Sequence, residues 1–358
     1  MNIRKIISCG KCFALALLAT PLFAGVTNPD ISLIGQVRSD WTNNPASLDS
    51  KRPTLYLGET ELSADAALNP YATGAVVLSF ADESVSVEEA YMKLEQGLPW
   101  GLAMKAGKYR APFGKLNPAH PHAYPFLDAP HVMDPANGLI PGQESYNETA
   151  LELSELFPGI DTWAPLLSFD VQQGSSFRNS QDTNAAFANF DSLKARTDMS
   201  WLAHLANSFM VGDGLAGDLG FSLARGTTNV EKQQHALLVG TDLKLKFYVN
   251  GETHVVWQTE GIWRRDDSAS AQKLGGYSFV DWQHNRFNAG ALYEQLGDAK
   301  TGKVSDRSVK GFAGFSLMEE TTLFRIAAEH RWLAGVTPYN TIEAQVLFSM
   351  GPHKPHQF

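Results

Sequence analysis

Apolar and polar residues alternate one by one in many long segments of this chain, and this pattern limits the folds open to it. Between residues 339 and 350, polar residues separate a series of apolar ones: Ile342, Ala344, Val346 and Phe348. The same alternation recurs in residues 236–247, 253–265 and 321–332. A period of two places successive side chains on opposite faces of a β-strand. The chain is therefore predicted to be all-β, with one apolar and one polar face on each strand.

Two architectures contain strands of this kind, a soluble β-sandwich and a transmembrane β-barrel. The predicted strands have about 9–12 residues, enough to cross a bilayer with tilt, whereas strands of soluble sheets average about 5–6. Their polar face carries several charges per strand, which a dry core does not accept unpaired. Aromatic residues gather at strand ends, as in the interfacial girdles of a barrel: Tyr71, Tyr109, Tyr248, Trp263, Trp332 and Tyr339. An antiparallel transmembrane β-barrel is favoured.

Sixteen strands are predicted, an even number as single-chain bacterial barrels require, and counts of 14 or 18 stay open. The predicted strands are 31–38, 55–67, 71–80, 86–95, 101–109, 147–154, 166–173, 197–206, 216–226, 234–247, 253–265, 274–284, 286–295, 308–318, 321–332 and 339–350. Long connections follow odd-numbered strands, and short ones follow most even-numbered strands. This asymmetry predicts short periplasmic turns and long external loops.

The longest connection, 110–146, contains seven of the 18 prolines and three of the ten histidines. A long proline-rich loop in a compact domain usually has a function or is disordered. As the predicted third external loop, it either folds into the lumen and narrows the pore or covers the barrel from outside. The sequence leaves both readings open.

Charge and hydropathy exclude two classes of protein. The net charge is −9, from 29 basic and 38 acidic residues, whereas a nucleic-acid-binding domain is expected to be basic. After residue 24 no uninterrupted run of 18 apolar residues occurs, which argues against membrane-spanning helices. The length also leaves no room for a TonB-dependent receptor, which needs about 22 strands and a plug domain.

Residues 1–24 are predicted to be a cleaved signal peptide, which implies export. Arg4, Lys5 and Lys11 form a positive region around the start of an apolar stretch. Both cysteines, Cys9 and Cys12, lie in this segment. The mature chain would therefore contain no disulfide and no thiolate metal ligand. The expected organisation is a barrel over residues 25–350 followed by a short polar tail, 351–358.

The segment 105–130, KAGKYRAPFGKLNPAHPHAYPFLDAP, carries a family resemblance. Together with residues 28–33, 87–91 and 350–358, it resembles a group of bacterial outer-membrane barrels related to the phosphate-selective porins and sometimes described as zinc-regulated. The resemblance implies a porin-type barrel in the outer membrane of a Gram-negative cell. It also implies a homotrimer and recognition by the barrel assembly machinery, through the C-terminal Phe358 or the strand that ends near Phe348.

Charged residues on the polar faces of the predicted strands are candidates for lining the pore. These are Lys244, Lys246, Glu260, Arg264, Arg325, Glu329, Arg331 and Glu343. Rings of Lys or Arg select anions. Because basic and acidic residues are balanced in this set, phosphate specificity is not predicted.

Histidines in the long loop suggest a metal site. His120 and His122 are two residues apart, so in an extended chain both rings would project to one side. With Asp128 or His131 they would offer the nitrogen and oxygen ligands that zinc accepts. His353 and His356 in the tail form a weaker candidate. The competing interpretation is that the loop histidines are solvated and pack on Tyr124 and Phe126.

No catalytic signature supports an enzyme. His254, His284 and Ser278 have suitable side chains, but no G-x-S-x-G or similar motif surrounds them. The sequence therefore predicts an outer-membrane porin with a water-filled pore for passive diffusion of small solutes or ions, constricted by loop 110–146. Its expected partners are outer-membrane lipid and its solutes, with no required cofactor and with zinc as the one candidate ion. The alternative is an outer-membrane protein that captures zinc through the histidine-rich loop without conducting.

Overall fold

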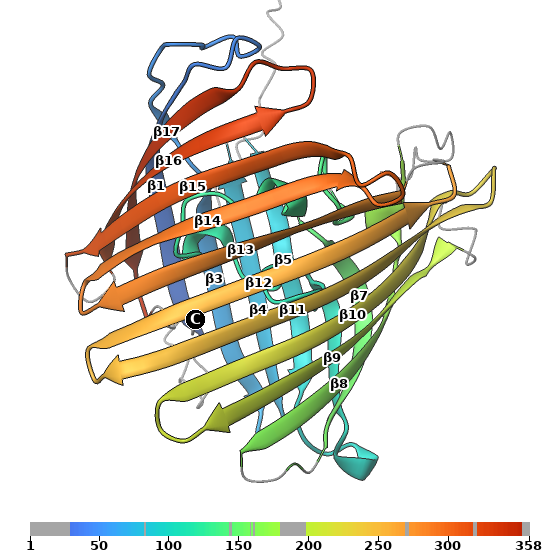
Figure 1. Ribbon diagram of the computed structural model, residues 1–358. Coiled ribbons are helices and arrows are strands. Elements are labelled where there is room, and N and C mark those ends of the chain that lie inside the picture. The colour runs from blue at the N-terminus through green and yellow to red at the C-terminus, as the bar shows by residue number, and fades with distance from the viewer. Residues whose placement is uncertain are drawn as a thin grey trace, which may run out of the picture.

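Long antiparallel strands close into a barrel in the computed structural model of the protein (Figure 1). The structure describes residues 29–81, 84–142, 145–157, 159, 162–179, 198–268, 272–317 and 321–352. The strands are β1 (Asp30–Thr42), β2 (Tyr56–Leu57), β3 (Thr60–Asn69), β4 (Ala72–Ala81), β5 (Ser84–Leu94), β6 (Ala103–Arg110), β7 (Asn147–Leu156), β8 (Trp163–Gln172), β9 (Ser200–Val211), β10 (Leu215–Asn229), β11 (Gln234–Asn250), β12 (Thr253–Asp266), β13 (Gln272–His284), β14 (Phe287–Asp298), β15 (Val304–Ser316), β16 (Thr322–Leu333) and β17 (Tyr339–Met350). The predicted signal peptide, 1–24, lies outside the described residues.

The barrel has 16 strands, because β2 is a two-residue start of the strand that β3 continues. Each strand pairs with its neighbours in the chain, and β1 closes the sheet by pairing with both β3 and β17. Along β17 the register runs from Leu33 opposite Met350 to Thr42 opposite Thr341. The predicted all-β fold, the antiparallel barrel and the count of 16 are confirmed.

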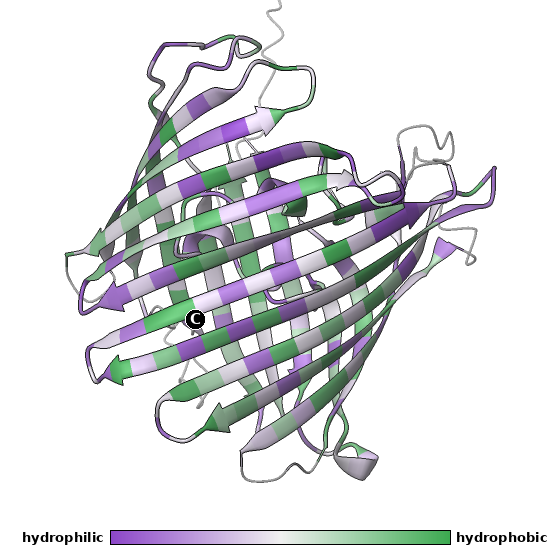
Figure 2. Cartoon of the chain, viewed as in Figure 1, coloured by the Kyte–Doolittle hydropathy of each residue, from purple (hydrophilic) through white to green (hydrophobic). Residues whose placement is uncertain are grey.

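Hydrophilic and hydrophobic residues alternate along the strands, seen as bands in Figure 2. The outward-facing side chains are mostly apolar, and many of the inward-facing ones are polar or charged. On β16, Ile326 points outward and is 53% exposed, whereas the neighbouring Arg325 points inward and is 8% exposed. The outer face matches a lipid environment, because apolar side chains there have no protein to pack on. Two of the predicted girdle aromatics are exceptions: Tyr109 and Tyr339 are buried inside the barrel, at 1% and 7% exposure.

The ends of the barrel differ in their connections. Short turns such as 70–71, 251–252 and 285–286 join the strands at one end. The longer connections 43–55 and 111–146 lie at the other end, as predicted. In the described part of the chain, no helix is long and apolar enough to cross a membrane.

The connection 111–146 folds into the barrel rather than over it (Figure 1). Phe113, Leu116, Phe126 and Leu139 of this loop are at most 1% exposed. They form a hydrophobic core with inward-facing residues of the wall: Leu202, Leu238, Ile262, Phe279, Leu292 and Phe312. Part of the interior is thus packed and dry, whereas the sequence predicts a water-filled lumen that the loop narrows. The apolar side chains of the loop replace water there.

Candidate functional site

Ion pairs tie the loop to three parts of the wall. Asp128 accepts two hydrogen bonds from Arg38 on β1, at 2.6 and 2.7 Å. Lys115 Nζ lies 2.8 Å from Asp218 on β10, and His131 Nε2 lies 2.7 Å from Glu329 on β16. Strands β1 and β16 are separated only by β17, whereas β10 lies on the opposite side of the closed sheet. The loop therefore spans the interior of the barrel.

Several of the predicted pore-lining residues also hold the loop. Glu260 accepts hydrogen bonds from the backbone N–H groups of Lys115 and Leu116, at 3.0 and 2.7 Å. Arg264 donates to the carbonyl of Leu139 at 3.0 Å. Arg325 donates to the carbonyl of His122, also at 3.0 Å. The backbone polar groups of a buried loop need such partners, and the wall supplies them.

The other predicted lining residues also face the interior. Arg331 pairs with Asp306 on β15 at 2.5 Å, and Glu343 lies 3.1 Å from Arg38. Lys244 and Lys246 line a separate space described next. All eight predicted pore-lining residues thus lie on the inner face of the barrel. Those that bind the loop are fixed in position by these contacts.

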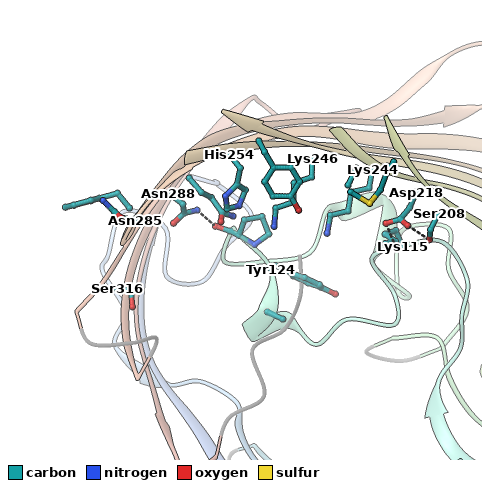
Figure 3. Close-up of a pocket in the computed structure, with 18 of the residues that line it drawn as sticks. Lys115, Tyr124, Ser208, Asp218, Lys244, Lys246, His254, Asn285, Asn288 and Ser316 are labelled. Carbon is teal, nitrogen blue, oxygen red and sulfur yellow. Dashed lines mark hydrogen bonds and ion pairs between the residues drawn. The ribbon is translucent and has the colours of Figure 1, made fainter. Parts of the chain in front are cut away.

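A cavity of about 1180 Å³ remains between the loop and the wall on the side of the short turns (Figure 3). Lys244, Lys246 and His254 lie side by side on its wall, and Lys115 enters from the loop. Its other basic residues are Arg286, Arg325 and His122. Among the described residues, Asp218 is the sole acidic residue that lines it. The sequence predicted a balanced lumen, but the structure gathers basic groups in this cavity, which we call the basic vestibule.

A second polar cluster lies where the loop meets strands β3 and β5. Glu61 on β3 lies between two loop histidines, 3.1 Å from His120 Nδ1 and 3.1 Å from His122 Nδ1. Glu89 on β5 lies 3.5 Å from His120 Nε2. Burial by itself lowers the pKa of His120, but its contacts with Glu61 and Glu89 outweigh burial and raise that pKa to about 10.

The structure brings together only part of the predicted metal set. His120 and His122 are adjacent, with ring centroids 5.5 Å apart, but Asp128 binds Arg38 and His131 binds Glu329 elsewhere in the barrel. The prediction that Asp128 or His131 completes their site is wrong, because both residues are paired with other parts of the wall. The acid that does face both rings is Glu61, which the sequence reasoning missed. His353 and His356 lie outside the described residues.

The residues considered for catalysis do not form a catalytic group. His254 faces the vestibule. Ser278 lies on the outer face, where its hydroxyl accepts a hydrogen bond from Trp257. His284 stacks on the outward Trp282. A nucleophile and its base must lie within hydrogen-bonding distance, and these three residues are divided between the two sides of the wall.

Comparison with known sequences gives one distant relative. The chain is 30% identical over 253 residues to a protein of Aquifex aeolicus described as uncharacterized. The match covers 64% of this chain and 52% of the other, so the chain spans about half the length of the curated relative it matches. No family model matches the chain.

Comparison with solved structures identifies the fold. Outer-membrane-expressed OmpT of Vibrio cholerae has a TM-score of 0.58 at 10% identity, over 92% of this chain and 99% of the other. The outer membrane channel DcaP of Acinetobacter baumannii has a TM-score of 0.58 at 8% identity, over 90% and 97%. The trimer form of OmpT has a TM-score of 0.56 at 10% identity, over 90% and 99%. This chain has the fold of an outer-membrane β-barrel.

Proposed function

We propose that the protein is a porin of the outer membrane through which small solutes or ions diffuse passively. The observation that carries this proposal is the arrangement of loop 111–146, which crosses the barrel interior and leaves a charged cavity of about 1180 Å³ beside it. A wet cavity inside a barrel offers solutes a path across lipid. The loop, held to the wall by ion pairs, limits the width of that path. The channel DcaP among the structural neighbours agrees with this function.

The basic vestibule gives the proposed pore a preference for anions. Lys115, Lys244, Lys246, Arg286 and Arg325 line it, against one acid, Asp218. Basic groups along a pore raise the local concentration of anions and exclude cations. The preference concerns small anions in general, since the vestibule shows no feature that selects one of them.

Planar-bilayer recording of the refolded mature chain in KCl tests the proposal. We expect stable stepwise currents, and a reversal potential in a salt gradient that indicates anion preference. Deleting residues 115–135 should raise the unit conductance, because the cross-barrel segment is lost. A matched control deletes residues 45–50 of the external connection 43–55, which should change the conductance little. A folded barrel that carries no current would refute the proposal.

Two further expectations go with this function. We propose a homotrimer, in agreement with the trimer form of Vibrio cholerae OmpT.

The alternative function is zinc capture without conduction, and the cluster of Glu61, His120 and His122 favours it. Bilayer recording separates the porin function from zinc capture. A protein that only captures zinc would bind the ion but carry no current.

A further inference from the structure

Two loop histidines and two wall glutamates meet in a buried cluster. His120 precedes the short helical turn η2 (Pro121–Ala123) and His122 lies within it, and Pro121 at its start favours this turn. Glu61 comes from β3 and Glu88 from β5. All four side chains belong to residues that are at most 9% exposed. The cluster thus joins the loop to the wall at strands β3 and β5.

The donor atoms are spaced as ligands of one metal ion are spaced. The two Glu61 oxygens each lie 3.1 Å from one histidine Nδ1, and Glu88 Oε2 lies 3.6 Å from His120 Nδ1. Ligands of a tetrahedral zinc ion with bonds of about 2.0–2.2 Å are about 3.3–3.6 Å apart. Small side-chain movements would therefore suffice for Glu61, His120 and His122 to reach one ion, and Glu88 lies beside His120 as the candidate fourth ligand.

A β-bulge in β5 places Glu88 in this cluster. Val77 of β4 is opposite Glu89, and Leu78 is opposite Val87, so Glu88 is the extra residue of a β-bulge. In a regular strand Glu88 and Glu89 would point to opposite faces, but here both are buried inside the barrel. Bulges redirect side chains beside functional sites. Glu88 Oε2 is also buried and accepts no hydrogen bond within the described chain.

Neighbouring groups orient the ligands as in known metal sites. His120 presents Nδ1 to Glu61 and Glu88, while its Nε2 lies 3.5 Å from Glu89. A metal-binding histidine usually donates its other N–H to a carboxylate, which fixes the ring. Arg110 pairs with Glu88, and its backbone N–H donates to Glu89 at 3.0 Å. Glu89 and Arg110 are thus placed as positioning residues.

We propose that Glu61, Glu88, His120 and His122 bind one divalent transition-metal ion of the zinc class, which fastens loop 111–146 to strands β3 and β5. Two imidazoles with carboxylates favour zinc and its neighbours over calcium or magnesium, which prefer oxygen ligands alone. Binding requires neutral imidazoles, so the ion displaces any proton held between the histidines and the glutamates. The effect on conduction rests on the proposed porin function, whereas the binding itself does not.

Calorimetric titration of the refolded full-length mature chain with Zn²⁺ in detergent tests the site. We expect one high-affinity equivalent of zinc, and a Co²⁺ complex with the visible absorption of tetrahedral cobalt. Replacing His120 with Gln should weaken binding by more than about 100-fold, and Glu89→Gln by about 10–100-fold. Migration on unheated gels reports whether each variant has folded.

Two control variants remove histidines outside the cluster. His235→Gln removes a histidine that also lies beside a carboxylate, 3.6 Å from Asp267, and His353→Gln with His356→Gln removes the tail histidines. Both should keep the wild-type affinity. If folded wild type binds no zinc, or if these controls lose as much affinity as His120→Gln, the proposal is wrong.

Bilayer recording separates this proposal from the porin function. Zinc should reduce fluctuations of the open current in wild type and have no such effect in His120→Gln. If wild type binds zinc but its fluctuations do not change, fastening of the loop is refuted while the metal site remains. If no chain conducts, the porin function fails, and the calorimetric result still decides the metal site.

Discussion

At the scale of single residues, the pair of Arg38 and Asp128 shows how the loop is fixed. Both Asp128 oxygens accept from Arg38, whose side chain is only 13% exposed. Asp128→Asn removes the charge and one acceptor, and because Asp128 is partly exposed we expect a loss of about 1–2 kcal/mol in loop attachment. Amide hydrogen exchange in residues 111–146 should then be about 5–30-fold faster. As a control, Asp49→Asn makes the same change at an exposed site in the external connection 43–55 and should leave amide exchange of the loop unaltered. Equal exchange rates in the two variants would contradict the role of Asp128 in fixing the loop.

At the scale of elements, the loop is held to the wall by an aromatic cluster. Phe126 is fully buried and contacts Phe279 on β13 and Phe312 on β15 edge-on, with centroids 5.2 and 5.6 Å apart. Replacing a buried phenylalanine with alanine costs about 3–5 kcal/mol. Phe126→Ala should therefore loosen the loop while the barrel stays closed, and trypsin should cleave at Lys115. Phe169→Ala, on the outer face, provides the control, and continued protection of Lys115 in Phe126→Ala would argue against the anchor.

At the scale of the whole molecule, the distribution of charge should decide ion preference. The chain is acidic, with a net charge of −9, yet basic side chains surround the vestibule. Lys244→Glu with Lys246→Glu should move the reversal potential in a KCl gradient toward that of K⁺, lowering the Cl⁻ to K⁺ permeability ratio several-fold. Lys232→Glu with Lys303→Glu makes the same change in net charge on exposed external connections. Equal shifts from both pairs would mean that overall charge, not the vestibule, sets the preference.

Much of the barrel was predictable because its signal is local. Residue by residue, the alternation around Val239 and Trp257 predicts which side chains face lipid, and the structure confirms those faces. Tyr109 and Tyr339 show the limit of that reasoning. Both are aromatic and lie near strand ends, but they occupy strand positions whose side chains point into the barrel. Inside it, Tyr109 donates a hydrogen bond to Asp170.

The candidate sites depended on contacts between distant parts of the chain. His131 and Glu329 are 198 residues apart, and Arg325 reaches the carbonyl of His122 across 203 residues. A single sequence carries no signal for such pairs. For the same reason Glu61 could not be recognised as the partner of His120 and His122, although both histidines were identified as candidates.

The sequence by itself determined the strand period and the inner and outer faces, because both follow from neighbouring residues on an extended chain. It predicted 16 strands but left 14 and 18 open, and the closed sheet decided the count. Tertiary structure decided the rest. Barrel closure brings β1, β3 and β17 together, and the burial of Phe113 and Phe126 draws the loop inside. Barrel closure and burial of the loop determine which charged groups come together. Lysines from the wall and the loop line the vestibule, and Glu61 lies against the loop histidines. Buried polar groups need hydrogen-bond partners, and these are the partners within reach.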